Sequence, residues 1–281
     1  MPADAAPEPP GWDRLVQAQR FAAQRLSGEP ARSPVAVAER LLAIQGQDPR
    51  GARLAVRARS TGLSAHDVDR ALTEERALVI TWLNRGTLHL LASEDYRWLH
   101  ALTAPTLFTA SARRLSQEGV TPAAADRGRA LAELARRYLA GHAPAEDRDL
   151  ARWSGLRLRD ARAGLAAIAS ELHEREDGLL ELSRRPAPAQ LPPPRLLGAF
   201  DPLLLGWRSR EALLDANHQR IVTVNGIFRP FALVRGRAVA TWTIAAGKVV
   251  LKPFAAALAH SDERALRADA RDVVRYLRLG V

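Results

Sequence analysis

The sequence predicts an α+β protein in which two helical units, each ending in a short β-hairpin, precede a strand-rich C-terminal region. Two observations support this: an order of three helices and a hairpin occurs twice, and turn dipeptides separate β-rich runs near the C-terminus. A third is size, because 281 residues with 47% hydrophobic content can bury one large core or several small ones. The predicted boundaries are a disordered leader at 1–10, a first unit at 11–92, a second unit at 93–185 and the C-terminal region at 186–281.

The first unit has the helix and hairpin signals of a winged helix. Ser64, with Asp67 three residues later, is typical of a capping box and begins a helix that runs to about Glu75. The turn Asn84-Arg85-Gly86 separates two β-rich runs and predicts a hairpin. The expected elements are helices over 12–26, 33–44 and 64–75, with the segment 53–59 between the last two, and strands over 77–83 and 87–91.

The same order recurs in the middle of the chain. Helices are predicted over Ala123–Leu139, Ala145–Trp153 and Leu158–His173, followed by a short wing over Gly178–Leu182. Ser154-Gly155 stands where a helix-turn-helix places its turn. Basic residues crowd the segment that would enter a DNA groove: Arg152, Arg157, Arg159 and Arg162. A helical bundle with basic surface helices is the alternative that this pattern leaves open.

The sequence of the C-terminal region predicts hairpins followed by one helix. Arg184–Pro194 is proline-rich and indicates a linker or an extended crossing segment. Asn225-Gly226, Arg235-Gly236 and Ala246-Gly247 are turn dipeptides between β-rich runs, which predicts a small antiparallel sheet or open barrel. The expected elements are strands over 220–224, 227–234, 237–244 and 249–253 and a helix from about 255 to 279.

Composition points to an anionic partner. The net charge is +10, and all but two of the 41 basic residues are arginine, whose planar guanidinium suits phosphate contact and base stacking. An arginine-rich composition set by genomic base content is the alternative. The absence of cysteine excludes disulfides, thiolate metal sites and a cysteine nucleophile. The leader lacks a signal-peptide pattern and the apolar run at 196–207 is too short for a membrane span, so a cytoplasmic protein without a membrane partner is expected.

Most familiar catalytic patterns are missing from the sequence. The seven histidines have no zinc spacing, the glycines form no phosphate cradle and there is no nucleophile elbow, so neither a metal nor a cofactor is expected. The unusual segment is Gln45-Gly46-Gln47-Asp48-Pro49, which follows an amphipathic helix. Because Gly46 and Pro49 end that helix, both glutamine amides can face one cavity. A polar helix end with glutamine as filler is the plainer interpretation.

Four segments in order carry a resemblance that covers most of the chain. They are LLAIQGQDPR at 41–50, TWLNRGTLHL at 81–90, FDPLLLGWR at 200–208 and VNGIFRP at 224–230. Together they resemble the AlkZ-like family of winged-helix DNA glycosylases. The resemblance implies tandem winged helices and a β-barrel arranged as a C-shaped cradle for DNA. It also implies a catalytic signature of Gln, an aliphatic residue and Gln, with Asp at the last place in a sister branch.

The resemblance assigns catalysis to Gln45 and Gln47. We expect Gln47 to orient a water molecule and Gln45 to support that water or the sugar, because a cationic alkylated purine needs little acid assistance to leave. Gly46 stands where the family has an aliphatic residue, which loosens the backbone. Asp48 either shares the catalytic role or caps a turn, and Asp201 either lines the lesion cavity or forms a buried structural turn.

The expected substrate is double-stranded DNA that contains N7-alkylguanine or a related bulky alkylated purine. No lysine lies near the glutamines, so a monofunctional enzyme is expected. The resemblance implies a monomer that acts in DNA repair or in self-resistance to a genotoxic natural product. The candidate DNA contacts lie in turns and wings: Arg85, Arg208, Arg210, Arg229, Arg235 and Arg237. The resemblance further implies that a β-hairpin probes the DNA, and the turn at 234–237 is its expected equivalent. The alternatives are a winged-helix transcription regulator, an adduct-sequestering protein and a structural nucleoid protein. The sequence does not say whether the lesion is flipped out of the duplex.

Overall fold

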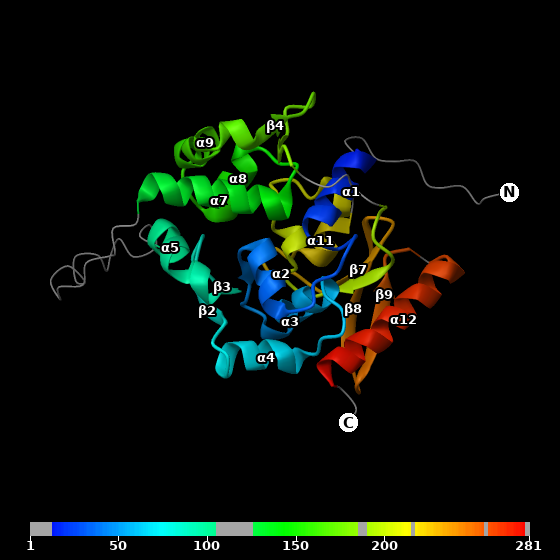
Figure 1. The fold of residues 1–281 in the computed structure, drawn as a ribbon. Helices are drawn as coiled ribbons and strands as arrows, with labels where there is room; N and C mark the ends of the chain where they lie inside the picture. Colours follow the sequence, from blue (N-terminus) through cyan, green and yellow to red (C-terminus); the bar gives the residue numbers. More distant parts are fainter. Residues whose placement is uncertain (1–12, 105–125, 185–189, 215–216, 256–257, 279–281) are drawn as a thin grey trace.

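The computed structural model describes residues 13–104, 126–184, 190–214, 217–255 and 258–278, and the predicted leader at 1–10 lies outside them. Figure 1 shows the helices of the second unit on one side, the C-terminal sheet and its helix on another, and α2 and α3 between them. Helices and antiparallel sheets occur together, so the predicted α+β class is confirmed. Among the described helices, none is long and apolar enough to cross a membrane.

The first unit contains the predicted helices and hairpin. The hairpin turns through Asn84 and Gly86, whose φ angles are 51° and 80°. The predicted capping box is present, because the Ser64 N–H and hydroxyl both donate to Asp67 at 2.8 Å. The elements are α1 (Arg14–Ala23), α2 (Pro34–Leu41), β1 (Ile44–Gln45), α3 (Pro49–Ala58), α4 (Ala65–Thr73), β2 (Leu78–Leu83) and β3 (Thr87–Ala92), with the strands in the antiparallel order β1-β3-β2.

The second helix ends three residues earlier than its apolar spacing predicts. Leu42 has φ 63° and ψ −45°, and the Ala43 N–H donates to the Leu41 carbonyl at 2.8 Å, which is a γ-turn. This conformation is strained for a leucine, but the side chain is fully buried and packing holds it in place. Ile44 and Gln45 consequently leave the helix and form β1.

The second unit contains the three predicted helices and the hairpin, preceded by a helix over Ser93–Thr103 that the sequence did not predict. The first of the predicted helices begins at the cap Asp126, because the Asp126 carboxylate accepts from the N–H groups of the first turn. The third predicted helix ends at Ala167 instead of His173, since His173 pairs with Glu181 in the hairpin. The elements are α5 (Ser93–Thr103), α7 (Arg127–His142), α8 (Asp147–Ser154), α9 (Leu158–Ala167), a 3-10 turn (Ala169–Glu171), β4 (Leu172–Glu174) and β5 (Leu180–Leu182).

The C-terminal region is an open antiparallel sheet covered by a long helix. Trp242 packs in this layer with Leu266 and Val273 of the helix. The elements are β6 (Arg195–Leu197), a 3-10 turn (Pro202–Leu204), α10 (Glu211–Leu214), α11 (His218–Ile221), β7 (Phe231–Val234), β8 (Arg237–Ala245), β9 (Lys248–Pro253) and α12 (His260–Leu277), with the strands in the order β6-β7-β8-β9.

The strand predicted at 220–224 is wrong. That segment ends α11 and continues as a loop with a single bridge between Val222 and Phe228. Val224 is fully exposed and Ile227 is 54% exposed, so no layer covers these β-branched side chains. Without burial on one face, β propensity alone does not extend the strand.

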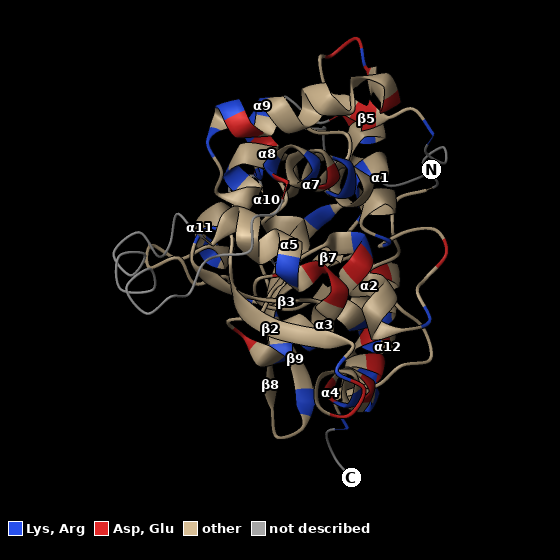
Figure 2. Cartoon of the chain, turned by 60° about the vertical axis from the view of Figure 1, so that its left-hand side comes forward, with Lys and Arg blue, Asp and Glu red and all other residues tan. Residues whose placement is uncertain are grey.

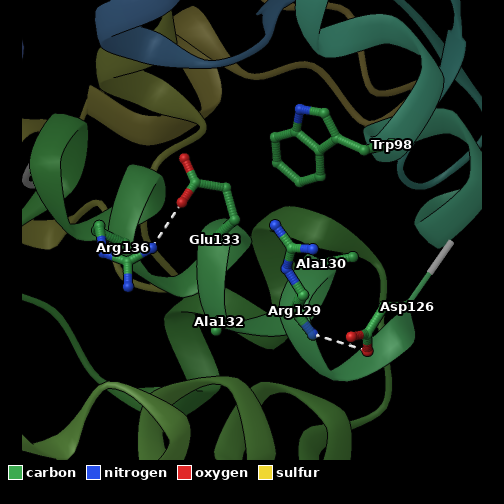
Figure 3. Close-up of a pocket in the computed structure, with 7 residues that line it drawn as sticks. All are labelled: Trp98, Asp126, Arg129, Ala130, Ala132, Glu133 and Arg136. Carbon is green, nitrogen blue, oxygen red and sulfur yellow. Dashed lines mark hydrogen bonds and ion pairs between the residues drawn. The ribbon is translucent and has the colours of Figure 1, made fainter.

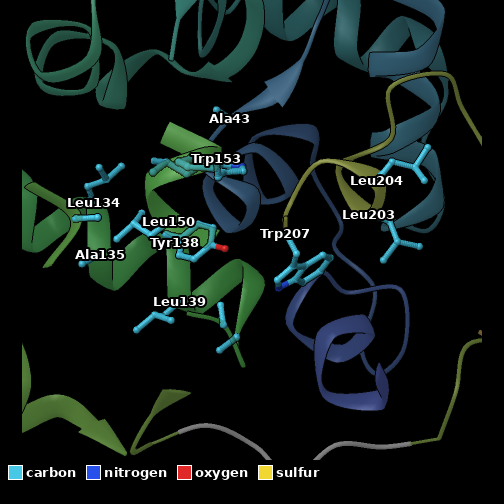
Figure 4. Close-up of a cluster of buried hydrophobic side chains, with 14 of the residues drawn as sticks. Ala43, Leu134, Ala135, Tyr138, Leu139, Leu150, Trp153, Leu203, Leu204 and Trp207 are labelled. Atoms are coloured by element: carbon cyan, nitrogen blue, oxygen red, sulfur yellow. The ribbon is translucent and has the colours of Figure 1, made fainter. Parts of the chain in front are cut away.

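One large apolar cluster joins the second unit to the C-terminal region. Figure 4 shows Tyr138 of α7 and Trp153 of α8 in the same cluster as Leu203, Leu204 and Trp207. The Tyr138 hydroxyl donates to the Gly206 carbonyl at 2.7 Å, and the Trp207 indole donates to the His142 carbonyl at 3.0 Å. The segment 203–207 therefore forms part of the core of the helical unit.

A fully buried ion pair joins the first unit to the C-terminal region. Arg59 and Asp201 have no exposed side-chain surface, and two guanidinium–carboxylate contacts measure 2.8 and 3.0 Å. Arg59 also donates to Gln24 at 2.7 Å and to the Ala55 carbonyl at 3.0 Å. Asp201 in addition accepts from the Leu203 N–H. Of the two alternatives for Asp201, the structure shows the buried structural turn.

Candidate active site

The two glutamines of the signature meet side chain to side chain. Gln45 ends β1 and is 7% exposed, whereas Gln47 is exposed on the loop that follows. The Gln45 Nε2 donates a hydrogen bond to the Gln47 Oε1. Residues two apart on an extended chain point to the same face, so the strand, and not the end of a helix, brings the amides together.

This hydrogen bond leaves the Gln45 Oε1 and the Gln47 Nε2 without a partner among the described residues. Gln47 Oε1 keeps a second lone pair. Amide groups do not titrate in the physiological range, so the pair presents carbonyl dipoles without carrying charge. The arrangement can orient a water molecule and can stabilise positive charge that develops nearby.

Asp48 acts as the N-cap of α3. Its Oδ1 accepts from the Arg50 N–H at 2.9 Å and from the Gly51 N–H at 3.0 Å. The start of α3 is fixed from the other side as well, because a Cβ on Gly198 would lie only 3.0 Å from the Gly51 backbone. The cap and this close backbone approach set the direction of the chain immediately after Gln47.

Gly46 occupies a position that other residues can also take. Its φ is not positive, and its N–H donates to the Leu88 carbonyl at 2.7 Å. A Cβ on Gly46 would lie 3.5 Å from the Leu90 nitrogen, which is ordinary van der Waals contact. The structure therefore has room there for a Cβ atom.

We expect Gly46→Ala to raise the free energy of unfolding by about 0.5–1 kcal/mol, because alanine loses less backbone entropy on folding than glycine does. Urea denaturation measures this change. Gly86→Ala is the matched control, since Gly86 has a φ of 80° and should lose stability on the same substitution. A loss at Gly46 as large as that at Gly86 would contradict the expectation.

His89 lies beside the glutamine pair, although the sequence did not single it out as a candidate. It lies opposite Gln45 in the β1–β3 register and is 4% exposed. Its Nδ1 lies 2.9 Å from the Thr87 carbonyl. Burial lowers the pKa of His89 to about 4, and Arg85 adds to that lowering. The alternation of side chains along β3 would have predicted from the sequence that His89 shares a face with Thr87. The position of His89 beside Gln45 follows only from the pairing of β1 with β3.

Three arginines gather where the first hairpin meets the second unit. Arg85 in the β2–β3 turn donates from Nη1 to the Arg152 carbonyl at 2.9 Å. Burial lowers the pKa of Arg210 to about 10, with Arg152 and Arg85 contributing, so it stays charged at neutral pH. No ion pair forms at any of the three within the described residues. We call Arg85, Arg152 and Arg210 the arginine cluster.

The contact between the units at this cluster depends on Gly155. Gly155 caps α8 with a φ of 77°, and a Cβ there would lie 3.1 Å from the Arg85 side chain and 3.3 Å from the Asn84 backbone. Only glycine readily adopts this positive φ and also leaves room for the first hairpin to approach so closely. The left-handed end of α8 therefore brings Arg152 next to the first hairpin.

The remaining predicted DNA contacts are dispersed or paired. The Arg208 N–H donates to Asp149 at 2.8 Å, and its guanidinium lies 3.7 Å from Glu146. Arg229 donates to the Arg220 carbonyl at 3.3 Å. Arg235 pairs with Asp262 of α12 at 3.1 Å, which ties the turn predicted as a probe to that helix. Arg237 follows at the start of β8. Of the predicted DNA contacts, the structure therefore brings Arg85 and Arg210 together, and Arg152 lies with them.

Figure 2 shows that α9 and α12 each carry both basic and acidic side chains. The contacts of the individual arginines therefore define a basic face better than the number of charges on a helix does. A cavity of about 760 Å³ is lined by two members of the arginine cluster, by a further arginine and by acidic residues: Arg152 and Arg210, Arg208, and Glu146, Asp149 and Glu211. Neither this cavity nor the one described next is lined by Gln45 or Gln47. The glutamine pair therefore stands outside both clefts.

A second cavity of about 510 Å³ lies between α5 and α7 (Figure 3). Its lining includes Trp98, Arg129 and Glu133, and the 2.6 Å ion pair of Glu133 with Arg136 borders it. It contains none of the predicted site residues. Over the described part of the chain, no group of three or more His, Cys, Asp or Glu side chains could hold a metal ion.

Comparison with known proteins identifies the family. A family model described as DNA glycosylase AlkZ-like matches residues 38–127 and 107–276, which is well over half of the chain. The solved structure of the DNA glycosylase AlkZ of Streptomyces sahachiroi has the same fold, with a TM-score of 0.79 and 22% identity over 94% of this chain and 96% of that chain. No curated protein matches. The resemblance carried by the four segments is thus confirmed: the chain belongs to the AlkZ-like DNA glycosylase family and is a DNA glycosylase.

Proposed function

We propose that this glycosylase hydrolyses the N-glycosidic bond of N7-alkylguanine, or of a related bulky alkylated purine, in duplex DNA. The observation that supports the proposal is the pair of hydrogen-bonded amides at Gln45 and Gln47, next to a cap that holds the following helix. The enzyme acts as a monomer, with the glutamine pair at the open surface and the DNA completing the site.

The chemistry of an N7-alkylated purine suits such a site. The base carries a positive charge before the bond breaks, so it leaves without protonation by a strong acid. The sugar then passes through an oxocarbenium-like state, as in glycoside hydrolysis. Amide carbonyl oxygens can stabilise that state and can position water, without a full negative charge to be desolvated. The exposed Gln47 orients the water, and the buried Gln45 holds Gln47 through the hydrogen bond between them.

The product is an intact strand with an abasic site. Strand cleavage by a bifunctional glycosylase needs an amine that forms a Schiff base with the sugar. The two lysines of the chain, Lys248 and Lys252, lie on β9. β9 belongs to the C-terminal sheet, whereas Gln45 ends a strand of the first sheet and Gln47 follows that strand.

The test uses duplex DNA with a single N7-methylguanine. We expect the protein to release the methylated base, which chromatography detects, and to leave a strand that breaks only after alkali treatment. Omission of alkali is the control for strand cleavage by the protein itself. Absence of base release under single-turnover conditions would overturn the proposed substrate, and breakage without alkali would overturn the monofunctional mechanism.

The arginine cluster should bind the DNA backbone. We expect Arg152→Ala to weaken binding to damaged and undamaged duplexes alike, and to reduce the slope of log K against log salt by about 1, because one phosphate contact is lost. Arg152 is exposed and forms no ion pair within the described residues, so the substitution leaves no buried partner behind. Fluorescence anisotropy over a salt series measures both quantities.

Arg267→Ala is the matched control, since Arg267 lies on α12 and pairs with Glu263 at 2.6 Å. It should leave the affinity and the salt slope unchanged. An unchanged salt slope in Arg152→Ala would remove the arginine cluster from the DNA interface.

A further inference from the structure

His89 lies in a row of polar side chains that crosses the first sheet. The register pairs Gln45 with His89 and His89 with Thr81, so all three side chains point to one face of the sheet. The Gly46 N–H donates to the Leu88 carbonyl, which makes Gln45 and His89 a non-hydrogen-bonded pair of the antiparallel ladder. Side chains approach most closely in pairs of this type. The imidazole is therefore a direct neighbour of Gln45.

The hydrogen bond of the ring determines which nitrogen carries the proton. A backbone carbonyl can only accept, so the Nδ1 that lies 2.9 Å from the Thr87 carbonyl must be the protonated nitrogen. A buried, neutral imidazole with a proton on Nδ1 has a lone pair on Nε2. The burial that lowers the pKa of His89 to about 4 keeps the ring in this neutral form near pH 7.

Nε2 is available for a further partner. It makes no hydrogen bond with any described residue, yet it is not sealed from solvent as the Thr87 Oγ1 is. The structure therefore has an unused acceptor nitrogen on the face of the sheet that also carries Gln45. A neutral ring suits this place, since a protonated one would repel a cationic purine and an oxocarbenium-like sugar.

We propose that the His89 Nε2 accepts a hydrogen bond from the attacking water and so acts as a second water-orienting group beside Gln47, which Gln45 holds in place; this rests on the proposed function. The water oxygen bonds to C1′ while the bond from C1′ to the purine breaks. The electron pair of that bond goes to the purine and neutralises its charge. The water bound to C1′, now positively charged, releases one proton to solvent along the hydrogen bond to Nε2 and becomes the new hydroxyl, so the charges balance.

The test compares two substitutions that each keep one half of the imidazole. Glutamine can place an acceptor where Nε2 stands, whereas asparagine can keep only the donor at the Nδ1 position. In single-turnover release of N7-methylguanine at saturating enzyme, we expect His89→Gln to stay within about fivefold of the natural protein and His89→Asn to lose about 100-fold. Thermal unfolding of both variants reports their stability.

A purely structural role of the Thr87 hydrogen bond predicts the opposite order, with His89→Asn active and His89→Gln impaired. That order, or equal and undiminished rates, would overturn the proposal. The unsubstituted protein gives a second measurement that does not depend on whether the variants fold. Its ¹⁵N resonances for His89 should report a proton on Nδ1 in the free protein.

The Nε2 resonance should then move towards its hydrogen-bonded position when duplex DNA with a pyrrolidine abasic-site analogue binds. An Nε2 resonance that is unaffected by this bound analogue would also overturn the role of His89. Failure of the natural protein to release N7-methylguanine would overturn the proposed substrate alone, because the resonance experiment uses no alkylated base.

Discussion

Gln47→Ala should lower the single-turnover rate of base release by about 100- to 1,000-fold, the usual effect of removing one preorganised dipole from an enzyme site. Gln47 is exposed, and its one hydrogen bond within the described residues is to Gln45, so the substitution should change the free energy of unfolding by no more than about 0.5 kcal/mol. Quenched time courses on N7-methylguanine duplex measure the rate, and urea denaturation measures the stability.

Two further variants separate the roles of the pair. Arg50→Ala changes an exposed neighbour in the first turn of α3 and should retain the natural rate of base release. Gln45→Ala leaves the Gln47 amide in place but removes the donor that orients it, so its rate should fall less than that of Gln47→Ala. If Gln47→Ala releases the base at the natural rate, the glutamine pair is not the catalytic site.

Asp201→Asn should destabilise the protein by about 3–5 kcal/mol at pH 7, because it leaves the Arg59 guanidinium buried without a counter-charge. Asparagine keeps nearly the same shape and one acceptor oxygen for the Leu203 N–H, so the expected loss comes mainly from the missing charge. Urea denaturation gives the value. The rate of base release, measured well below the unfolding temperature, should change little.

Glu75→Gln is the matched control, because Glu75 pairs with Arg70 at 2.9 Å and both side chains are nearly half exposed. Solvent screens that pair, so its loss should cost less than about 1 kcal/mol. If Asp201→Asn instead reduced base release without reducing stability, Asp201 would belong to the lesion site and not to the core.

Elements that depend on a few neighbouring residues can be predicted from the sequence alone. Ser64 and Asp67 form their capping box within one helical turn, and the turn at Asn84-Arg85-Gly86 forms the hairpin that its dipeptides predict. The juxtaposition of Gln45 and Gln47 is also local, since two residues on an extended chain share a face. Motifs of this kind have their physical cause in a few consecutive residues, so a single sequence suffices to predict them.

Features that join distant segments of the chain follow from the folded structure and not from local sequence. Burial of Leu42 ends α2 early and turns Gln45 into a strand residue, which helical periodicity could not show. Register places His89 beside Gln45, and the close contact at Gly155 places Arg152 beside Arg85. The sequence alone allows Asp201 to line a cavity or to form a buried turn, and its buried ion pair with Arg59 shows the buried turn. Each depends on contacts across many residues of sequence, whose energies come from packing and desolvation and not from local conformational preference.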